Sequence, residues 1–198
     1  MRKTIVIFAI AVGLWAFTPH ISQSEKQTDN RKIPEIQANT PQNKADKIKW
    51  YSIEEASALS KQNPRKIIID VYTDWCGWCK KMDAHTFSNP TIASYINENY
   101  YAVKLDAEQK ASIEFQGETF NFIEQGRKGY HELAAALLNG RLSFPTIVFL
   151  NEKMEVITPL PGYQKPETLD PVLKYLIEGY DKGISWEDFS KNHYQSSF

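Results

Sequence analysis

The two cysteines of the chain, Cys76 and Cys79, stand two residues apart in the sequence WCGWC, at a point where a helix is expected to begin. Thiols at this spacing can form a disulfide and can also exchange it. The unpaired amide groups and the dipole at a helix N-terminus favour the thiolate of Cys76. Cys79 follows one turn later, where a buried thiol can resolve a mixed disulfide. The pair therefore predicts redox chemistry, with Cys76 as the attacking nucleophile.

The residues around the pair add charge and aromatic surface. Gly77 and Trp78, which separate the cysteines, carry no ionisable group, whereas Lys80 and Lys81 bring positive charge that Asp74 opposes. Two roles are open for Trp75 and Trp78: apolar contact with a substrate, or packing within the protein.

Two other uses of the cysteine pair are less favoured. In a zinc site, Asp83 and His85 would have to complete the ligands, but zinc prefers four converging ligands, and the sequence has no second CxxC or paired histidine. An inert structural disulfide would stabilise little, because the loop it closes is very short. We therefore expect a redox-active disulfide and no metal.

Composition restricts the class of protein. The 198 residues suffice for one ordinary domain with some extra length, and 42% of them are apolar. A net charge of -1 with 24% charged residues excludes a fully disordered chain and an obviously basic nucleic-acid binder. Two cysteines exclude a disulfide-stapled miniprotein, but they leave room for one redox pair.

The first 46 residues do not have the pattern of a folded domain. A basic start at Arg2 and Lys3 precedes the uncharged apolar run Thr4–Phe17, which is typical of a secretory signal and short for a spanning helix. No small-x-small cleavage pattern follows it. Residues 1–24 are therefore predicted to be a signal peptide or an N-terminal membrane anchor, and the polar residues 25–46 a flexible linker. This pattern predicts a periplasmic or otherwise extracytoplasmic protein.

The remainder alternates between strand and helix patterns, with a domain expected over residues 47–182. The first half predicts a helix from the Ser52 capping box to Gln62, a buried strand at Lys66–Tyr72, a helix at the cysteines, a helix ending near Asn99 and a strand at Tyr100–Leu105. A right-handed crossover would make the two strands parallel. The second half predicts a hairpin at Ser112–Ile123, a helix at His131–Asn139, strands at Thr146–Leu150 and Glu155–Thr158, and a helix at Lys165–Gly179. Trp186 and Phe189 allow the tail, residues 183–198, to dock on the domain.

Across about residues 47–180 the sequence resembles the thioredoxin superfamily. The resemblance rests on WCGWCK after KIIIDVYTD, on Asp70 six residues before Cys76, and on Phe144-Pro145-Thr146 before a strand. It implies a thioredoxin-like α/β fold, in which a central mixed sheet is flanked by helices. It also implies that Asp70 assists proton transfer at Cys79. Pro145 would be cis, would shape a peptide groove and would keep metal from the thiols. The simpler alternatives are a locally hydrogen-bonded Asp70 and a trans Pro145.

The chain departs from a compact thioredoxin in two ways. The cysteines enclose Gly-Trp rather than Gly-Pro, without the histidine of strongly oxidising relatives, and Pro145 lies 66 positions after Cys79. The inserted hairpin at Ser112–Ile123 accounts for much of this length. The chain thus resembles exported bacterial thioredoxin-like proteins with an inserted segment. We expect the hairpin near the redox face, with Phe115, Phe120 or Phe122 either available to a client or covering the core.

Together these patterns predict an exported protein thiol–disulfide oxidoreductase that exchanges its CxxC disulfide with client proteins as a reductase. No organic cofactor is implied, because the disulfide itself carries the electrons. The expected partners are protein thiols and disulfides and an upstream redox partner, and the protein is expected to be monomeric and not to bind nucleic acid. The alternative is a non-catalytic peptide-binding module with a structural disulfide.

Overall fold

The computed structural model describes residues 47–126 and 128–198. The predicted signal or anchor and the predicted linker therefore lie outside the described residues. Within the described part of the chain, no helix combines the length and the apolar character needed to cross a membrane.

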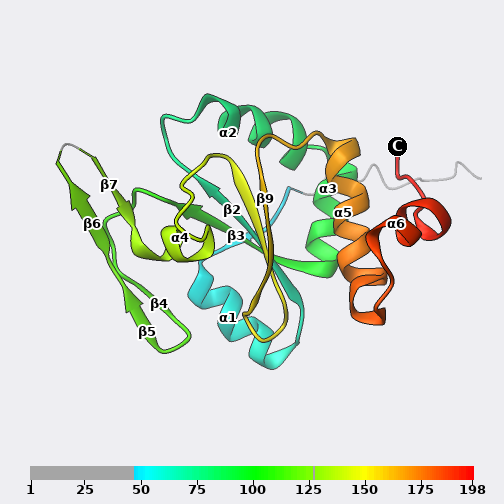
Figure 1. Ribbon diagram of the computed structural model, residues 1–198, viewed down its shortest axis with the longest axis horizontal. Helices are drawn as coiled ribbons and strands as arrows, with labels where there is room; N and C mark the ends of the chain where they lie inside the picture. The colour runs from blue at the N-terminus through cyan, green and yellow to red at the C-terminus, as the bar shows by residue number, and fades with distance from the viewer. Residues whose placement is uncertain (1–46, 127) are drawn as a thin grey trace, which may run out of the picture. The chain divides into compact units, whose positions relative to one another are not determined.

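A five-stranded mixed sheet forms the centre of the fold (Figure 1). In spatial order its strands are β1 (Trp50–Tyr51), β3 (Tyr100–Asp106), β2 (Lys66–Tyr72), β8 (Thr146–Leu150) and β9 (Val156–Pro161). Strands β2 and β3 are parallel, and β8 runs antiparallel to β2. The predicted parallel crossover and the mixed sheet are confirmed. Strand β1 was not predicted, because two residues are too few to show an alternating pattern.

Helices cover both faces of this sheet. They are α1 (Ile53–Gln62), α2 (Gly77–Met82), α3 (Pro90–Asn99), α4 (Glu132–Leu137), α5 (Pro166–Glu178) and α6 (Trp186–Asp188). Short helical segments also follow three of them, at Asp83–Phe87 (η1), Tyr180–Lys182 (η2) and Phe189–His193 (η3). The predicted capping box is present, since Ser52 Oγ accepts from the Glu55 amide and the Glu55 carboxylate accepts from the Ser52 amide.

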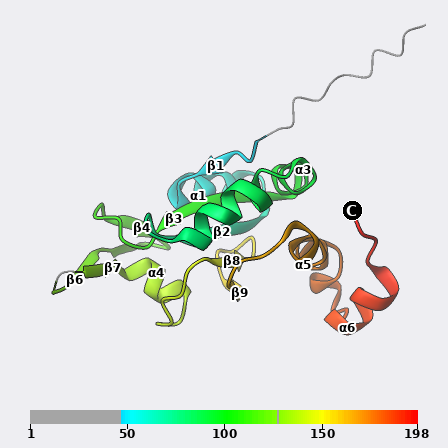
Figure 2. The same ribbon diagram turned by 90° about the horizontal axis from the view of Figure 1, so that it is seen from above.

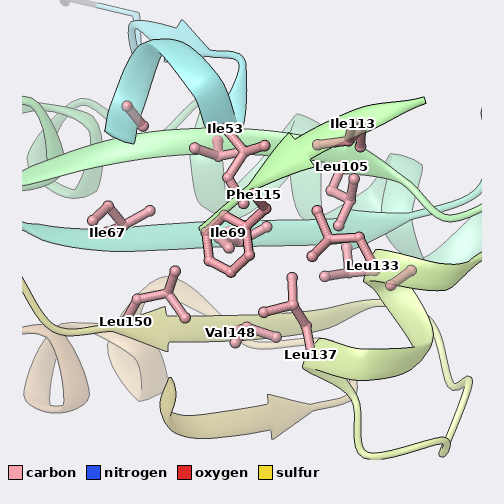
Figure 3. Packing of buried hydrophobic residues seen from close by; sticks show 14 of the residues in the cluster. Ile53, Ile67, Ile69, Leu105, Ile113, Phe115, Leu133, Leu137, Val148 and Leu150 are labelled. Carbon is pink, nitrogen blue, oxygen red and sulfur yellow. The ribbon is translucent and has the colours of Figure 1, made fainter. Parts of the chain in front are cut away.

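Side chains of β2 alternate between two hydrophobic cores. Ile67, Ile69 and Val71 face a cluster that includes residues of α1 and α4, whereas Ile68 faces a cluster with α2, α3 and α5. Figure 3 shows the first cluster between the sheet strands, α1 and α4. Because β2 is buried on both faces, its sequence is almost continuously apolar, and Lys66 at its start and Asp70 are the charged exceptions.

The inserted segment contains two hairpins rather than the single predicted one. The first joins β4 (Ile113–Phe115) to β5 (Glu118–Phe120), and the second joins β6 (Phe122–Gln125) to β7 (Lys128–His131). They lie side by side at one end of the sheet (left in Figures 1 and 2). The prediction of one hairpin over Ser112–Ile123 is thus corrected: Phe122 does not return along β4 but starts the second hairpin.

The tail beyond residue 183 docks on α5. Phe189 is buried and packs against the ring of Tyr175. Gly179 makes this approach possible, because a Cβ at that position would lie 2.9 Å from the Phe189 ring. The buried carboxylate of Asp170 accepts hydrogen bonds from the Tyr194 hydroxyl and from Ser197. The tail is therefore a packed part of the domain.

Candidate redox site

The two cysteines lie at the start of α2, a short loop after β2, and they form a disulfide. Cys76 is the N-cap residue of α2, and its Sγ accepts a hydrogen bond of 3.0 Å from the Cys79 amide. An amide hydrogen aimed at Sγ would also stabilise a thiolate there, which favours Cys76 as the nucleophile. Both cysteines are buried in the disulfide form, since Cys76 is 5% exposed and Cys79 1%.

Asp70 is completely buried in the middle of β2. It alternates with Val71 and Ile69 and so lies on the face that carries Ile68, toward α2. Its Oδ2 accepts a hydrogen bond of 2.7 Å from Lys104 Nζ, and its Oδ1 has no partner among the described residues. Burial raises the pKa of Asp70 to about 6, and the nearby Lys104 ammonium opposes this increase without cancelling it.

Lys104 is a site residue that the sequence analysis missed. It lies on β3 directly opposite Asp70 in the parallel register, and its ammonium also bonds the carboxylate of Asp83, which follows α2. Burial disfavours the ammonium, but the two carboxylates outweigh that cost and raise the pKa of Lys104. A signal was available: a lysine in an apolar strand that is predicted to pair with the strand holding Asp70.

The sequence pattern offers Asp83 only as a zinc ligand, whereas its partner in the structure is Lys104. Among the described residues, no group of three or more histidine, cysteine or acidic side chains could hold a metal ion. The acidic pair Asp70 and Asp83 is instead linked through one ammonium group. This link joins the buried interior to a residue whose side chain is 44% exposed.

The loop before β8 lies close to the disulfide loop. The Phe144–Pro145 peptide bond is cis, as the resemblance implies, and the Pro145 carbonyl accepts from the Gly162 amide. The Phe144 ring packs edge-on against the ring of Trp75. Phe144, the residue before Pro145, therefore contacts Trp75, the residue before Cys76.

Both tryptophans beside the disulfide are largely exposed, and each is also held by packing. Trp75 is 65% exposed, and its Nε1 donates a 3.0 Å hydrogen bond to Glu108 Oε1. Trp78 is 57% exposed and packs against Tyr163. One part of each ring thus packs within the protein, while the other part faces solvent, and contact with a substrate stays a prediction. Glu108 and Tyr163, which hold them, carry no signal in the sequence.

A five-stranded mixed sheet flanked by helices, with a CxxC disulfide at a helix start and a cis-proline loop, defines a thioredoxin fold with a redox-type cysteine pair. The model of the thioredoxin-like domain family matches residues 53–177, and the chain belongs to this family. The solved structures of a Thermus thermophilus thioredoxin and a Helicobacter pylori thioredoxin-fold protein have the same fold. The first has a TM-score of 0.52 at 18% identity and covers 76% of this chain and 100% of its own. The second has a TM-score of 0.50 at 20% identity, with coverages of 65% and 80%.

Three curated relatives match this chain over only a small part of their own length. An uncharacterized protein of Caenorhabditis elegans is 27% identical over 51% of this chain, and the spermatogenesis-associated protein 20 of Rattus norvegicus is 29% identical over 45%. The thiol:disulfide interchange protein DsbD of Vibrio vulnificus is 35% identical over 26%. The matched parts span only 16%, 11% and 9% of these three relatives. The likeness therefore concerns one part of each relative.

Proposed function

We propose that the protein is an exported protein thiol–disulfide oxidoreductase that reduces disulfides in client proteins. One observation carries this proposal: a disulfide capping α2 together with a fully buried Asp70 on the strand that leads to it. A disulfide that served only to hold the loop would not need a charged group buried in the adjacent strand, where desolvation is costly.

The proposed reaction begins with the reduced protein. The Cys76 thiolate attacks one sulfur of the client disulfide, so that a Cys76–client bond forms and the client's other sulfur leaves as a thiolate. The Cys79 thiolate then attacks Cys76 Sγ and releases the client's second thiolate. Two electrons and two protons pass to the client, and the Cys76–Cys79 disulfide forms. A separate thiol reductant must then return two electrons, which is the role of the proposed upstream partner.

Asp70 supplies the proton step. Cys79 must lose its proton to attack, and a carboxylate can accept it directly or through one water. With Lys104 donating to Oδ2, the proton of neutral Asp70 belongs on Oδ1, the oxygen without a partner in the described residues. A pKa of about 6 keeps Asp70 mostly ionised at neutral pH, but close enough to neutrality to exchange protons readily.

The direction and location rest on the sequence. Gly77 and Trp78 supply no histidine or other cation between the cysteines that would stabilise the reduced thiolate strongly, and this supports a reductase. The basic start and the apolar run at Thr4–Phe17 support export, and a monomer is the proposed state. Cell fractionation tests the location: recovery of the protein from the cytosol alone would contradict export.

The decisive experiment compares Cys79→Ser with Cys76→Ser. Cys79→Ser should accumulate mixed disulfides with client proteins, visible on non-reducing gels, because the attacking thiol remains and the resolving thiol is gone. Cys76→Ser should accumulate few. Equal trapping by both variants, or none together with no reduction of insulin by the wild type, would instead favour the non-catalytic peptide-binding module.

A further inference from the structure

A groove of about 550 Å³ opens beside Trp75, in the loop that carries the disulfide. It lies between Trp75, the turn after β3 and the β6–β7 hairpin. Its lining residues include Trp75, Glu108, Lys110, Phe122, Glu124 and Lys128. Its volume is in the range of sites that bind small ligands or short peptide segments. Because Trp75 directly precedes Cys76, one wall of the groove continues from the reactive disulfide.

Phe122 lines the groove, and its ring lies against Gly129 on the opposite strand of its hairpin. A Cβ at position 129 would be 2.1 Å from that ring and 2.5 Å from the Ile123 carbonyl, so only glycine at Gly129 leaves room for Phe122. The ammonium of Lys110 lies over the same ring. On the other wall, the hydrogen bond to Glu108 fixes the indole of Trp75. Two aromatic rings are therefore held on the walls of one groove.

The first hairpin of the insert has a different role. Phe115 is buried in the core, and Phe120 packs against that core. Of the two roles expected for these rings, both therefore have the one of covering the core. Phe122, by contrast, belongs to neither core cluster and lines the groove. The second hairpin is thus the part of the insert that shares the groove with Trp75.

We propose that this groove binds an extended client segment next to the client's reactive cysteine, with a bulky apolar side chain packed between Trp75 and Phe122. The proposal rests on the proposed function and names its substrate class. Among the described lining residues, the charged groups are two glutamates and two lysines, so net charge gives little discrimination there. An apolar side chain beside an accessible disulfide is a feature of unfolded or partly folded proteins, because native proteins bury such side chains.

The test uses peptide disulfides and the full chain. The substrates are two peptide dimers, each made of two identical peptides joined by a disulfide. One dimer has leucine at the second and third positions from the cysteine, and the other has serine there. The pre-reduced protein converts one peptide disulfide to two thiols per turnover, and chromatography follows the product. We expect the leucine peptide to react with about a tenfold higher second-order rate constant than the serine peptide, from partial burial of one apolar side chain.

Variants at Phe122 locate that preference. Phe122→Ser should bring the leucine-to-serine ratio close to one, and Phe122→Leu should retain most of it. Hydroxyethyl disulfide, which has no side chain for the groove, serves as the reference substrate, and each peptide rate is divided by the rate of the same protein with this reference. An unchanged ratio in Phe122→Ser would overturn the proposal. Failure of the wild type to reduce hydroxyethyl disulfide would instead contradict the oxidoreductase activity itself.

A charge reversal at Glu124 tests the groove without altering either of its aromatic rings. Glu124 lines the groove, and Glu118 is also an exposed glutamate, on the first hairpin and outside the groove. Glu124→Lys should raise the rate with leucine peptides that carry an adjacent aspartate by about threefold and lower it with those that carry a lysine. Glu118→Lys should do neither. Equal effects of the two substitutions would overturn the groove as the binding site.

Discussion

Two lysines of the central sheet each bind two carboxylates, yet they create opposite situations. At the start of β2, Lys66 is buried and bonds Glu152 and Asp181, which are both substantially exposed. Within β3, Lys104 is 23% exposed and bonds Asp70, which is completely buried, together with Asp83. The same set of residue types thus buries a cation in one place and an anion in the other.

The difference shows that burial, rather than residue type, decides what such a cluster can do. Burial of Lys66 favours its neutral form, but the exposed carboxylates of Glu152 and Asp181 stabilise the ammonium more strongly. The pKa of Lys66 is therefore raised. Around Lys104 the pKa of Asp70 is raised to about 6, where a carboxyl can exchange a proton near neutrality. The first cluster is suited to stability and the second to proton transfer. Four substitutions test this division.

The largest effect should come from neutralising the partners of Lys66. The double variant Glu152→Gln with Asp181→Asn leaves a buried ammonium without a counter-charge, and this should lower the free energy of unfolding by about 3 kcal/mol. Urea denaturation measures it. The rate of insulin reduction at saturating reductant should be unchanged in the folded variant, and a slower rate would mean that this cluster also serves the reaction.

The stability of the wild type relative to Asp70→Asn should depend on pH. The pKa of Asp70 is higher in the folded than in the unfolded protein, so the folded state binds the proton more tightly. The wild type should therefore lose about 2 kcal/mol relative to the variant as the pH rises from 4 to 7. Denaturation curves of the oxidised proteins provide the values. A difference that does not vary with pH would show that the pKa of Asp70 is not raised.

The same variant should be a poor catalyst. Asp70→Asn cannot accept the proton of Cys79, so insulin reduction at neutral pH should slow by about tenfold, although the fold is retained. Glu152→Gln is the matched control, because it removes one carboxylate from the other lysine cluster. An unchanged rate in Asp70→Asn would exclude Asp70 from the proton path.

The smallest effect is expected at Asp83. Its carboxylate contributes to the raised pKa of Asp70 and also shares the ammonium of Lys104. In Asp83→Asn, a negative charge near Asp70 is lost, and the Lys104 ammonium is no longer shared with a second carboxylate. Both changes should lower the pKa of Asp70 slightly. The acidic limb of the pH–rate profile should then move to lower pH by a few tenths of a unit, on the scale of a partly exposed charge pair. A shift to higher pH would contradict this arrangement.

The sequence predicted those features that local patterns determine. Strands β2 and β8 have the predicted bounds, because continuous β-branched and apolar residues mark a strand buried on both faces. Asp70 stood out because an acid interrupts such a run. Lys104 was missed because its long apolar stem suits an apolar strand, and only the register of β2 against β3 reveals its partner. The second hairpin was missed because its polar strands show no clear alternation.

Docking of the tail has a practical consequence for dividing this chain into fragments. The family match ends at residue 177, but Phe189 packs on Tyr175, and Tyr194 and Ser197 donate hydrogen bonds to the buried Asp170. A fragment cut at the end of the matched range would expose an aromatic surface on α5 and leave that carboxylate without those donors. Such a fragment should aggregate more readily and resist proteases less well than the chain that extends to residue 198.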